Sequence, residues 1–269
     1  MTDAGAATFR ILVISMDSAV DRQRAFVERA RDAGVEWRFM PAYTSLHPAL
    51  QYVEDDAIVA WGRPLRRGEL GCYASHYAAW EQLLADDVDQ YVVLEDDVIV
   101  DWTFLRMLAP SRLAQWGVDY LRLYYKAPCK FSILKHNFVE ESHTLIELKG
   151  MALGTQGYVV TKAGAQGFLD HCKKVVRPID VAMDRVWAHG VKNRAVFPFP
   201  IMEAAVASGI GASRYEPFVA PSNLKLKRRV ARAHERLWSR AAVAAAALVT
   251  RWRRSRLGAA FGVRRPDYR

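Results

Sequence analysis

Short apolar runs alternate with amphipathic stretches along residues 1–223. Apolar runs bounded by polar positions are typical of buried strands, whereas apolar residues three and four positions apart are typical of helices. Strands are predicted at Phe9–Ser15, Val35–Met40, Tyr91–Leu94, Tyr120–Tyr124, His143–Lys149, Gly157–Thr161 and Ala195–Phe199. Helices are predicted at Asp21–Ala33, Glu69–Ala85, Lys162–His171 and Pro178–His189, with a loop over Trp61–Gly68. This alternation predicts an α/β fold whose central sheet is mostly parallel.

The pattern changes after Pro221-Ser222-Asn223, where turn residues precede a basic segment. We therefore predict two parts, a domain over residues 1–223 and a basic amphipathic helix within residues 224–269. Apolar positions recur along the helix every three or four residues, at Leu226, Val230, Ala233, Leu237, Ala241, Ala244, Leu248 and Trp252. A parallel stripe consists of Arg229, Arg232, Arg236 and Arg240.

Charge is divided unevenly between these two parts. Residues 224–269 hold 14 Lys and Arg against two acidic residues, a net charge of +12, whereas residues 1–223 hold 24 against 27, a net charge of −3. Basic amphipathic helices bind anionic lipid headgroups, so we expect the tail to hold the protein on an anionic membrane surface. Packing of the helix on its own domain is the alternative. A nucleic-acid-binding protein would need a basic body, so we expect no nucleic acid partner.

Composition excludes several classes of protein. Hydrophobic residues make up 51% of the chain, with 8 Trp, 11 Tyr and 11 Phe, which excludes a disordered chain. Cys72, Cys129 and Cys172 form no Cys-X-X-Cys pair, so neither a disulfide framework nor a zinc knuckle is expected. No apolar stretch reaches the roughly 18 residues that span a bilayer, and the N-terminus lacks a signal-peptide core. We expect a cytoplasmic protein without a membrane span.

Three consecutive carboxylates, Glu95-Asp96-Asp97, directly follow the predicted strand Tyr91–Leu94. Adjacent like charges raise one another's pKa unless a cation or hydrogen bonds neutralise them. Alternation along an extended chain places Glu95 and Asp97 on one side and Asp96 on the other. Two carboxylates on one side suit Mg²⁺ or Mn²⁺. A solvated acidic turn before a helix near Asp101 is an equally good interpretation of this pattern alone.

A second group of polar residues lies near the start of the predicted helix at residues 69–85. Gly68 and Gly71 allow close backbone approach there, and Glu69 suits the helix dipole. Glu69, Cys72 and His76 share one face of the helix and could bind a metal ion. A helix packed on the core, with the His76 ring hydrogen-bonded, is the favoured interpretation.

A third polar group combines a glycine-rich segment with a helix start. The segment Gly154-Thr155-Gln156-Gly157-Tyr158 runs into a predicted strand, and Pro178-Ile179-Asp180 opens a predicted helix. Proline suits the first helical position, and Asp180 in the first turn gains from the helix dipole. This position is a sufficient structural account of Asp180, and Asp184 follows one turn later.

Several of these segments, taken in order and at their spacings, resemble glycosyltransferase family 25, which includes bacterial lipopolysaccharide galactosyltransferase-like enzymes. The resemblance covers most of residues 9–210. It implies a GT-A-like fold, a UDP-sugar donor (usually UDP-galactose) and inverting transfer to a sugar hydroxyl. The matching segments are ILVISMDSAVDR at 11–22, GELGCYASHYAAW at 68–80, VLEDDV at 93–98, GTQGYVVTKAGA at 154–165 and PID at 178–180.

The resemblance also implies roles for residues at the ends of the predicted strands. Glu95 and Asp97 match the acidic motif that places a metal ion, Mn²⁺ or Mg²⁺, and the donor diphosphate. Ser15, Arg22 and Asp96 fall where the family binds its nucleotide-sugar donor. One departure lies here, because many members have Ile-Asn-Leu where this chain has Ile14-Ser15-Met16.

Catalysis would then require a carboxylate that accepts the proton of the acceptor hydroxyl. By the same resemblance Asp180 is the expected base and Asp184 the alternative, while Glu69 and His76 are expected to support the site. The expected acceptor is a lipid-linked saccharide such as lipopolysaccharide, reached from the inner face of the cytoplasmic membrane. A family member that binds a glycan or nucleotide without turnover, and a basic-tailed nucleic-acid-binding protein, are the alternatives.

Overall fold

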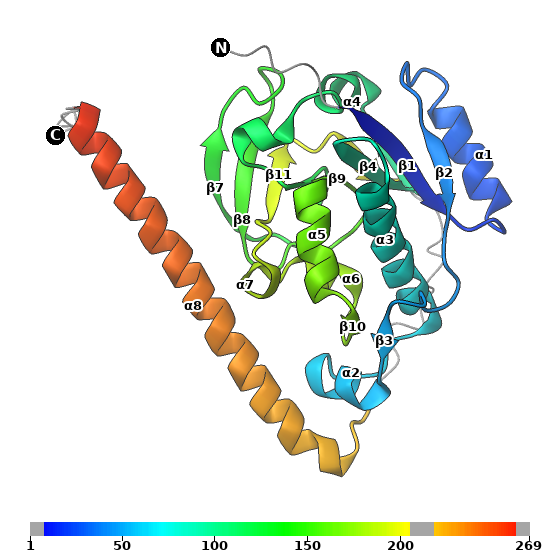
Figure 1. Cartoon of the computed structure of the whole chain (residues 1–269), viewed down its shortest axis with the longest axis vertical. Helices are drawn as coiled ribbons and strands as arrows, with labels where there is room; N and C mark the ends of the chain where they lie inside the picture. The colour runs from blue at the N-terminus through cyan, green and yellow to red at the C-terminus, as the bar shows by residue number, and fades with distance from the viewer. Residues whose placement is uncertain (1–7, 205–217, 262–269) are drawn as a thin grey trace.

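The computed structural model describes residues 8–204 and 218–261 (Figure 1). The strands are β1 Phe9–Ser15, β2 Arg38–Pro41, β3 Gln51–Tyr52, β4 Gln90–Glu95, β5 Val98–Val100, β6 Tyr120–Arg122, β7 Lys130–Lys135, β8 Thr144–Lys149, β9 Gly157–Thr161, β10 Lys174–Val175, β11 Arg194–Phe197 and β12 Ile201–Glu203. The helices are α1 Val20–Arg29, α2 Glu54–Ala60, α3 Arg67–Ala85, α4 Trp102–Leu108, the 3₁₀ turn η1 Leu113–Trp116, α5 Lys162–His171, α6 Ile179–Met183, α7 Val186–His189 and α8 Ser222–Phe261. The predicted α/β fold is confirmed.

The central sheet has eight strands in the order β2-β1-β4-β9-β6-β11-β8-β7. Its pairs β1–β2, β1–β4 and β6–β11 are parallel, but β4–β9, β6–β9, β8–β11 and β7–β8 are antiparallel. The prediction of a mostly parallel sheet is therefore wrong. Hairpins such as β7–β8 need only a short turn, whereas each parallel pair needs a crossover connection, and the sequence pattern does not distinguish the two.

Helices cover both faces of this sheet. Alternate residues of β1 belong to different cores, since Leu12 packs in the cluster that contains Trp80 of α3, and Val13 in the cluster that contains Phe26 of α1. This is the period-two alternation of a strand buried on both faces. Helices α3 and α5 lie side by side on the first face (Figure 1).

The start of α3 rests directly on the backbone that follows β2. A Cβ atom at Gly71 would lie 2.4 Å from the carbonyl oxygen of Tyr43, so only glycine permits this approach. The Ser75 hydroxyl accepts a hydrogen bond from the Tyr43 amide at 2.9 Å and donates to the Gly71 carbonyl at 2.8 Å. These contacts account for Gly71 and Ser75 in the sequence of α3, and they fix the position of α3 relative to the backbone that follows β2.

The predicted helix Pro178–His189 is instead two short helices, α6 and α7. The break lies at Asp184 and Arg185, whose side chains bind partners in different parts of the molecule. Asp184 is bound inside the domain by Arg122, whereas Arg185 donates two hydrogen bonds to Glu235 of α8, at 2.6 and 2.7 Å. Because both partners are distant in sequence, the helical periodicity of this segment did not reveal the break.

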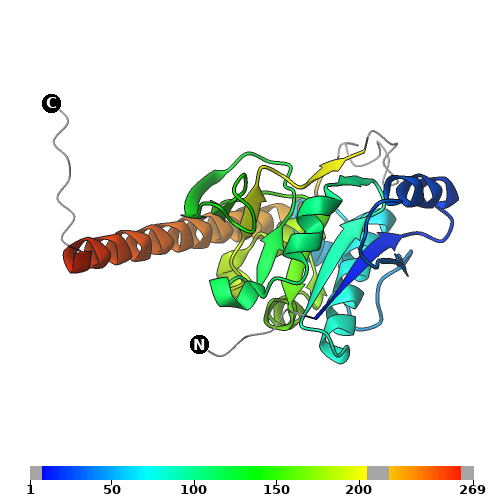
Figure 2. The same ribbon diagram turned by 90° about the horizontal axis from the view of Figure 1, so that it is seen from above.

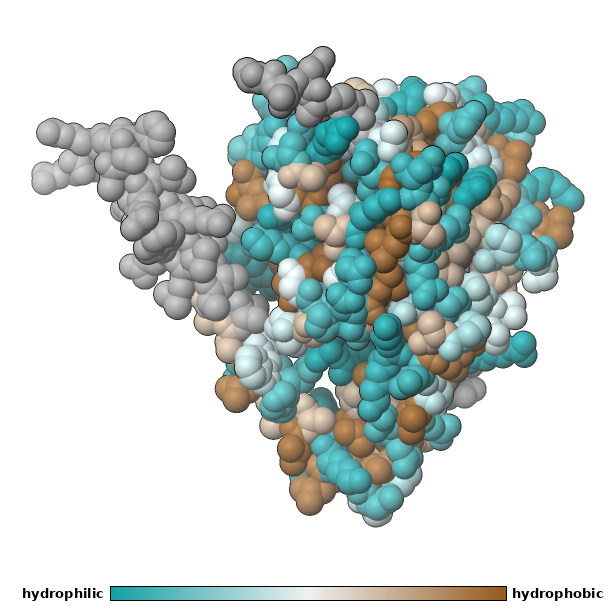
Figure 3. All heavy atoms as spheres, in the orientation of Figure 1, coloured by the Kyte–Doolittle hydropathy of each residue, from teal (hydrophilic) through white to brown (hydrophobic). Residues whose placement is uncertain are grey.

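The tail helix α8 begins at Ser222, so the predicted boundary at residue 223 falls within its first turn. Its start packs on the domain, where Leu224 joins a small buried cluster with Ile58 and Ala220. Farther along, α8 leaves the body (Figures 1 and 2). Even before it does so, the side chains of Leu226 and Leu237 are exposed. Figure 3 shows apolar and hydrophilic side chains mixed on the part of the helix nearest the body.

The edge strand β7 closes the far side of the sheet and was not predicted. Its side chains are mostly exposed, including Phe131, Ile133 and Leu134, and it begins and ends with Lys130 and Lys135.

No helix among the described residues is long and apolar enough to cross a membrane.

Candidate functional site

The candidate site lies where β1 and β4 end side by side. Ile14 of β1 pairs in register with Glu95, the last residue of β4. The next loop of the sheet joins them, because the Glu95 amide donates to the Gln156 carbonyl at 2.9 Å. The carboxyl ends of parallel strands are where open α/β sheets bind ligands. The acid triplet therefore stands at the edge of the sheet that the sequence predicted.

Ser15, Arg22 and Asp96, the three residues expected to bind the donor, are brought together. The Ser15 hydroxyl donates to Oδ2 of Asp96 at 2.6 Å, and the Arg22 guanidinium lies 3.3 Å from Oδ1. Burial raises the pKa of Asp96, against the opposing effects of Ser15 and Arg22. Because Ser15 and Arg22 both bind Asp96, these contacts hold the turn in place, and the role of the three residues toward a donor stays a prediction.

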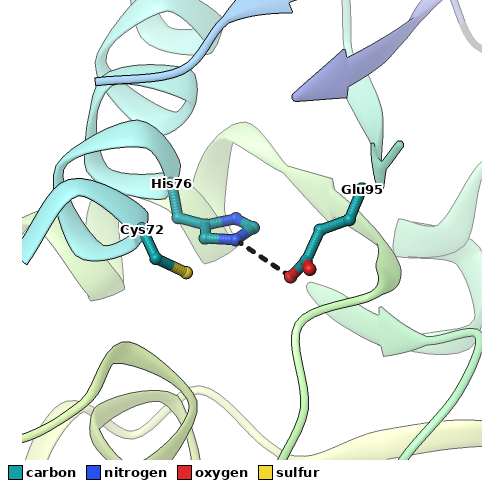
Figure 4. A group of neighbouring side chains, drawn as sticks. All are labelled: Cys72, His76 and Glu95. Carbon is teal, nitrogen blue, oxygen red and sulfur yellow. Dashed lines mark ion pairs between the residues drawn. The ribbon is translucent and has the colours of Figure 1, made fainter. Parts of the chain in front are cut away.

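Glu95 is turned toward α3. The Thr155 hydroxyl donates to its Oε1, and Nε2 of His76 lies 3.7 Å from the same oxygen (Figure 4). Burial would raise the pKa of Glu95, but the nearby His76 ring, the hydrogen bond from Thr155 and the charge of Lys126 hold it below its ordinary value. Glu95 is thus ionised at neutral pH.

Asp97 has an environment that does not balance its charge. Burial, followed by the nearby charges of Glu95 and Asp96, raises its pKa to about 6. Its Oδ1 is buried and has no hydrogen-bond partner among the described residues. A divalent cation would supply the missing partner and relieve the repulsion. The surroundings of Asp97 and Glu95 therefore fit a divalent metal ion, and their role as its ligands stays a prediction.

Cys72 and His76 lie one turn apart on α3 and face Glu95. The ligand atoms of these three side chains all lie within 4.8 Å of one another (Figure 4). Nδ1 of His76 is 3.0 Å from the Tyr158 hydroxyl, which also accepts a hydrogen bond from Nε1 of Trp80 at 3.1 Å. Burial raises the pKa of the Cys72 thiol well above its ordinary value, so the metal-free thiol is protonated and a poor nucleophile.

Glu69 does not point into this group. Its carboxylate pairs with the Arg63 guanidinium at 2.7 and 2.8 Å and accepts a hydrogen bond from the Arg66 amide at 2.9 Å. Burial would raise the pKa of Glu69, but these partners lower it. The arrangement is that of a residue that caps α3, and the predicted role in supporting the site is not tested by it.

The two candidate bases have different surroundings. Asp180 is half-buried, and its oxygens accept hydrogen bonds from the Val181 amide at 2.8 Å and the Gly154 amide at 3.3 Å. Its charge also helps to raise the pKa of Cys72, as does that of Glu95. Asp180 therefore lies beside the same group of side chains and keeps access to solvent.

Asp184 is only 1% exposed and fully engaged. It accepts hydrogen bonds from Arg122 at 2.7 Å, from the Asn193 amide at 2.6 Å and from the Leu153 backbone amide at 2.7 Å. Burial raises its pKa against the opposing charge of Arg122. This geometry favours Asp180 over Asp184 as a group that can reach an acceptor hydroxyl.

Sequence reasoning missed Arg122 and Asn193. Arg122 is 1% exposed and donates to Oδ1 of Asn193 at 2.9 Å and to the carbonyls of Leu153 and Gly154. Both of these loop residues have left-handed backbones, with φ of +57° and +88°. The buried network thus shapes the loop that presents Thr155 to Glu95. The available signal was a single arginine inside an apolar strand sequence.

Lys126 and Glu203 form a polar rim that sequence reasoning also missed. Nζ of Lys126 lies 2.5 Å from Oε1 of Glu203, which also accepts a hydrogen bond from the Gln156 side chain at 2.9 Å. The Lys126 side chain is 39% exposed, so it can contact a ligand from its present position. Lys126 is thus a cation close to two carboxylates, since it pairs with Glu203 and its charge also acts on Glu95.

The chain resembles known proteins over most of this region. A family model described as Glycosyltransferase family 25 (LPS biosynthesis protein) matches residues 9–183. This range includes Ser15, the acid triplet and Asp180, and it ends just before Asp184. The site described above is thus almost entirely within the matched part of the chain.

Three relatives illustrate the range of similar proteins. A Glycosyltransferase 25 family member from Aedes aegypti is 28% identical over 191 residues, covering 65% of this chain and 28% of that protein. Procollagen galactosyltransferase 1 from Danio rerio is 32% identical over 130 residues, covering 44% of this chain and 20% of that protein. Probable inactive glycosyltransferase 25 family member 3 from Bos taurus is 32% identical over 114 residues, covering 40% and 18%. The chain spans less than a third of the length of each.

Proposed function

Since the chain belongs to glycosyltransferase family 25, we propose that it is an active enzyme that moves a hexose, galactose foremost, from a UDP-sugar to a saccharide hydroxyl with inversion. The observation that carries the proposal is the unpartnered buried oxygen of Asp97 beside Glu95, at the ligand-binding edge of the sheet. The name of the Danio rerio relative supports galactose as the sugar. A GT-A-like donor site is part of the same proposal.

Glu95 and Asp97 are the residues that would hold Mn²⁺ or Mg²⁺. When bound, the ion would stabilise the negative charge that develops on the departing diphosphate. Asp96 would keep the turn in place through Ser15 and Arg22, and the Arg22 guanidinium would also contact the donor.

Asp180 would act as the general base. It accepts the proton of the acceptor hydroxyl, the hydroxyl oxygen attacks the anomeric carbon, and the bond from that carbon to UDP breaks. The amides of Val181 and Gly154 already hold the Asp180 carboxylate in one orientation. Lys126 at the rim would offer its ammonium group to the phosphate oxygens of the donor.

The exposed part of the tail helix α8 supports a proposal for the acceptor and for the location of the protein. Residues of α8 beyond Glu235 combine exposed Leu237 and Trp238 with the basic residues Arg236 and Arg240. Such a helix can lie in the headgroup region of an anionic membrane. We therefore propose a peripheral position on the inner face of the cytoplasmic membrane and a lipid-linked acceptor, such as a lipopolysaccharide precursor.

A screen of UDP-sugars with the purified chain tests this function. We expect UDP release that depends on Mn²⁺ or Mg²⁺ and is fastest with UDP-galactose, and that increases when a saccharide acceptor is added. The Asp97→Asn variant is the matched control, because its side chain has nearly the same size. Binding of a UDP-sugar by calorimetry without any UDP release would instead identify a non-catalytic member, as the name of the Bos taurus relative describes that protein.

A further inference from the structure

The group Cys72, His76 and Glu95 brings three different metal-ligating side chains together from two elements. Cys72 and His76 project from one face of α3, and Glu95 comes from the end of β4, with all three side chains turned toward a common space (Figure 4). The proposed sugar transfer gives the Cys72 thiol no role. A thiol, an imidazole and a carboxylate within 4.8 Å are instead a ligand set with its own chemistry.

We propose that these three side chains form a binding site for a transition-metal ion of the zinc class. Sulfur and imidazole ligands favour Zn²⁺ and Co²⁺, whereas Mg²⁺ and Mn²⁺ favour oxygen ligands. Bond lengths of about 2.0–2.3 Å place the ligand atoms of a tetrahedral zinc ion roughly 3.5 Å apart. The 3.7 Å between Nε2 of His76 and Oε1 of Glu95 already matches that spacing. Three protein ligands leave one position open to solvent or substrate.

The surroundings of His76 support this assignment. The ring is 1% exposed, and the Tyr158 hydroxyl lies 3.0 Å from Nδ1, while Trp80 donates to the same hydroxyl. A partner at one ring nitrogen is the arrangement that orients a metal-binding histidine. It leaves Nε2 directed at Cys72 and Glu95. Both of these residues are half-buried, so an ion can enter from solvent.

A zinc-class ion in this group would share Glu95 with the proposed Mn²⁺ pair of Glu95 and Asp97. Its binding would withdraw Glu95 from that pair and inhibit transfer. This consequence rests on the proposed function, but the binding of the ion does not. The two can therefore fail separately, and the test measures binding directly.

The probe is Co²⁺, added to the untagged, metal-free full chain. We expect one Co²⁺ per chain with a thiolate-to-cobalt charge-transfer band in the near ultraviolet, displaced by Zn²⁺ and not by an excess of Mn²⁺. Cys72→Ser should lose the band while thermal unfolding remains cooperative. Cys129→Ser and Cys172→Ser are matched controls, because they remove the other two cysteines and should retain it.

Glu95→Gln provides a second variant in case Cys72→Ser does not fold. It should keep the thiolate band but bind Co²⁺ at least about tenfold more weakly, since one charged ligand is lost. Absence of the band in the wild-type chain overturns the proposal, as does a band of full intensity in Cys72→Ser. A normal band in a chain that transfers no sugar leaves this site in place and contradicts only the proposed activity.

Discussion

Asp97 is held in an unfavourable state by the residues around it. Its pKa is about 6, above the ordinary 3.8, because of burial and of the charges of Glu95 and Asp96. The folded chain therefore retains a proton on Asp97 between these two values, where the unfolded chain has lost it. As the pH rises through this window, the metal-free protein loses stability from this group.

Because the ionised Asp97 carboxylate destabilises the metal-free folded protein, we expect Asp97→Asn to stabilise it above pH 6. The gain should be about 1–2 kcal/mol in the free energy of unfolding, after allowance for partial exposure of the side chain. The same variant should lose metal-dependent UDP release. Urea unfolding in a chelator at pH 5 and pH 8 measures the first effect, and equal stabilities of variant and wild type at pH 8 would contradict it.

Asp180 offers a test of catalysis apart from donor binding. Asp180→Asn should lower the rate of transfer by about 10²–10⁴-fold, because the proton acceptor is lost, while UDP affinity stays unchanged. Steady-state kinetics and calorimetry with UDP measure the two quantities. A collapse of UDP affinity would place Asp180 in the donor site instead.

At the scale of elements, the loop before β9 depends on one buried ion pair. Arg122→Met should lower the free energy of unfolding by about 3–5 kcal/mol, because it leaves Asp184 buried without its charged partner. Urea unfolding measures this loss. The double variant Arg122→Met with Asp184→Leu is the control and should recover much of the stability. If the single variant loses less than about 1 kcal/mol, the pair does not hold the loop.

Several helices and strands show which parts of the fold the sequence could predict. The bounds of β1, β9 and α5 were predicted to the residue, because each is a continuous local pattern with a clear turn or cap at its ends. The Glu95-Asp96-Asp97 turn was placed at the correct edge of the sheet for the same reason. Local patterns carry this information.

The remainder depends on contacts between residues far apart in the sequence. The direction of β9 in the sheet, the break between α6 and α7 and the partners of Arg122 are all set by such contacts. Arg122 binds Leu153, Asp184 and Asn193, which are 31, 62 and 71 residues away. Periodicity and spacing do not report partners at these separations, so the network that shapes the site could not be predicted.

At the scale of the whole molecule, α8 combines a packed start with a free continuation. Leu224 and Glu235 bind the domain, so a chain that ends after Ser239 keeps these contacts. Truncation after Ser239 removes Arg240 and the basic residues that follow, each of which contributes about 1 kcal/mol of attraction near an anionic membrane surface. We expect this truncation to reduce sedimentation with anionic vesicles while leaving transfer to a soluble acceptor nearly unchanged.

Truncation after Asn223 is the companion variant. It should reduce vesicle binding further, but it should also lower thermal stability, because Arg185 and Ile58 lose their partners on α8. Equal vesicle binding by the full chain and both truncated chains would show that the tail is not the anchor.

The open edge of the sheet at β7 has a consequence for the protein in concentrated solution. Its outer backbone groups and the exposed Phe131, Ile133 and Leu134 could template a strand from another molecule. Lys130 and Lys135 bracket this segment with positive charge, so two copies that approach edge to edge repel each other. We expect neutral replacement of both lysines to promote self-association through this edge.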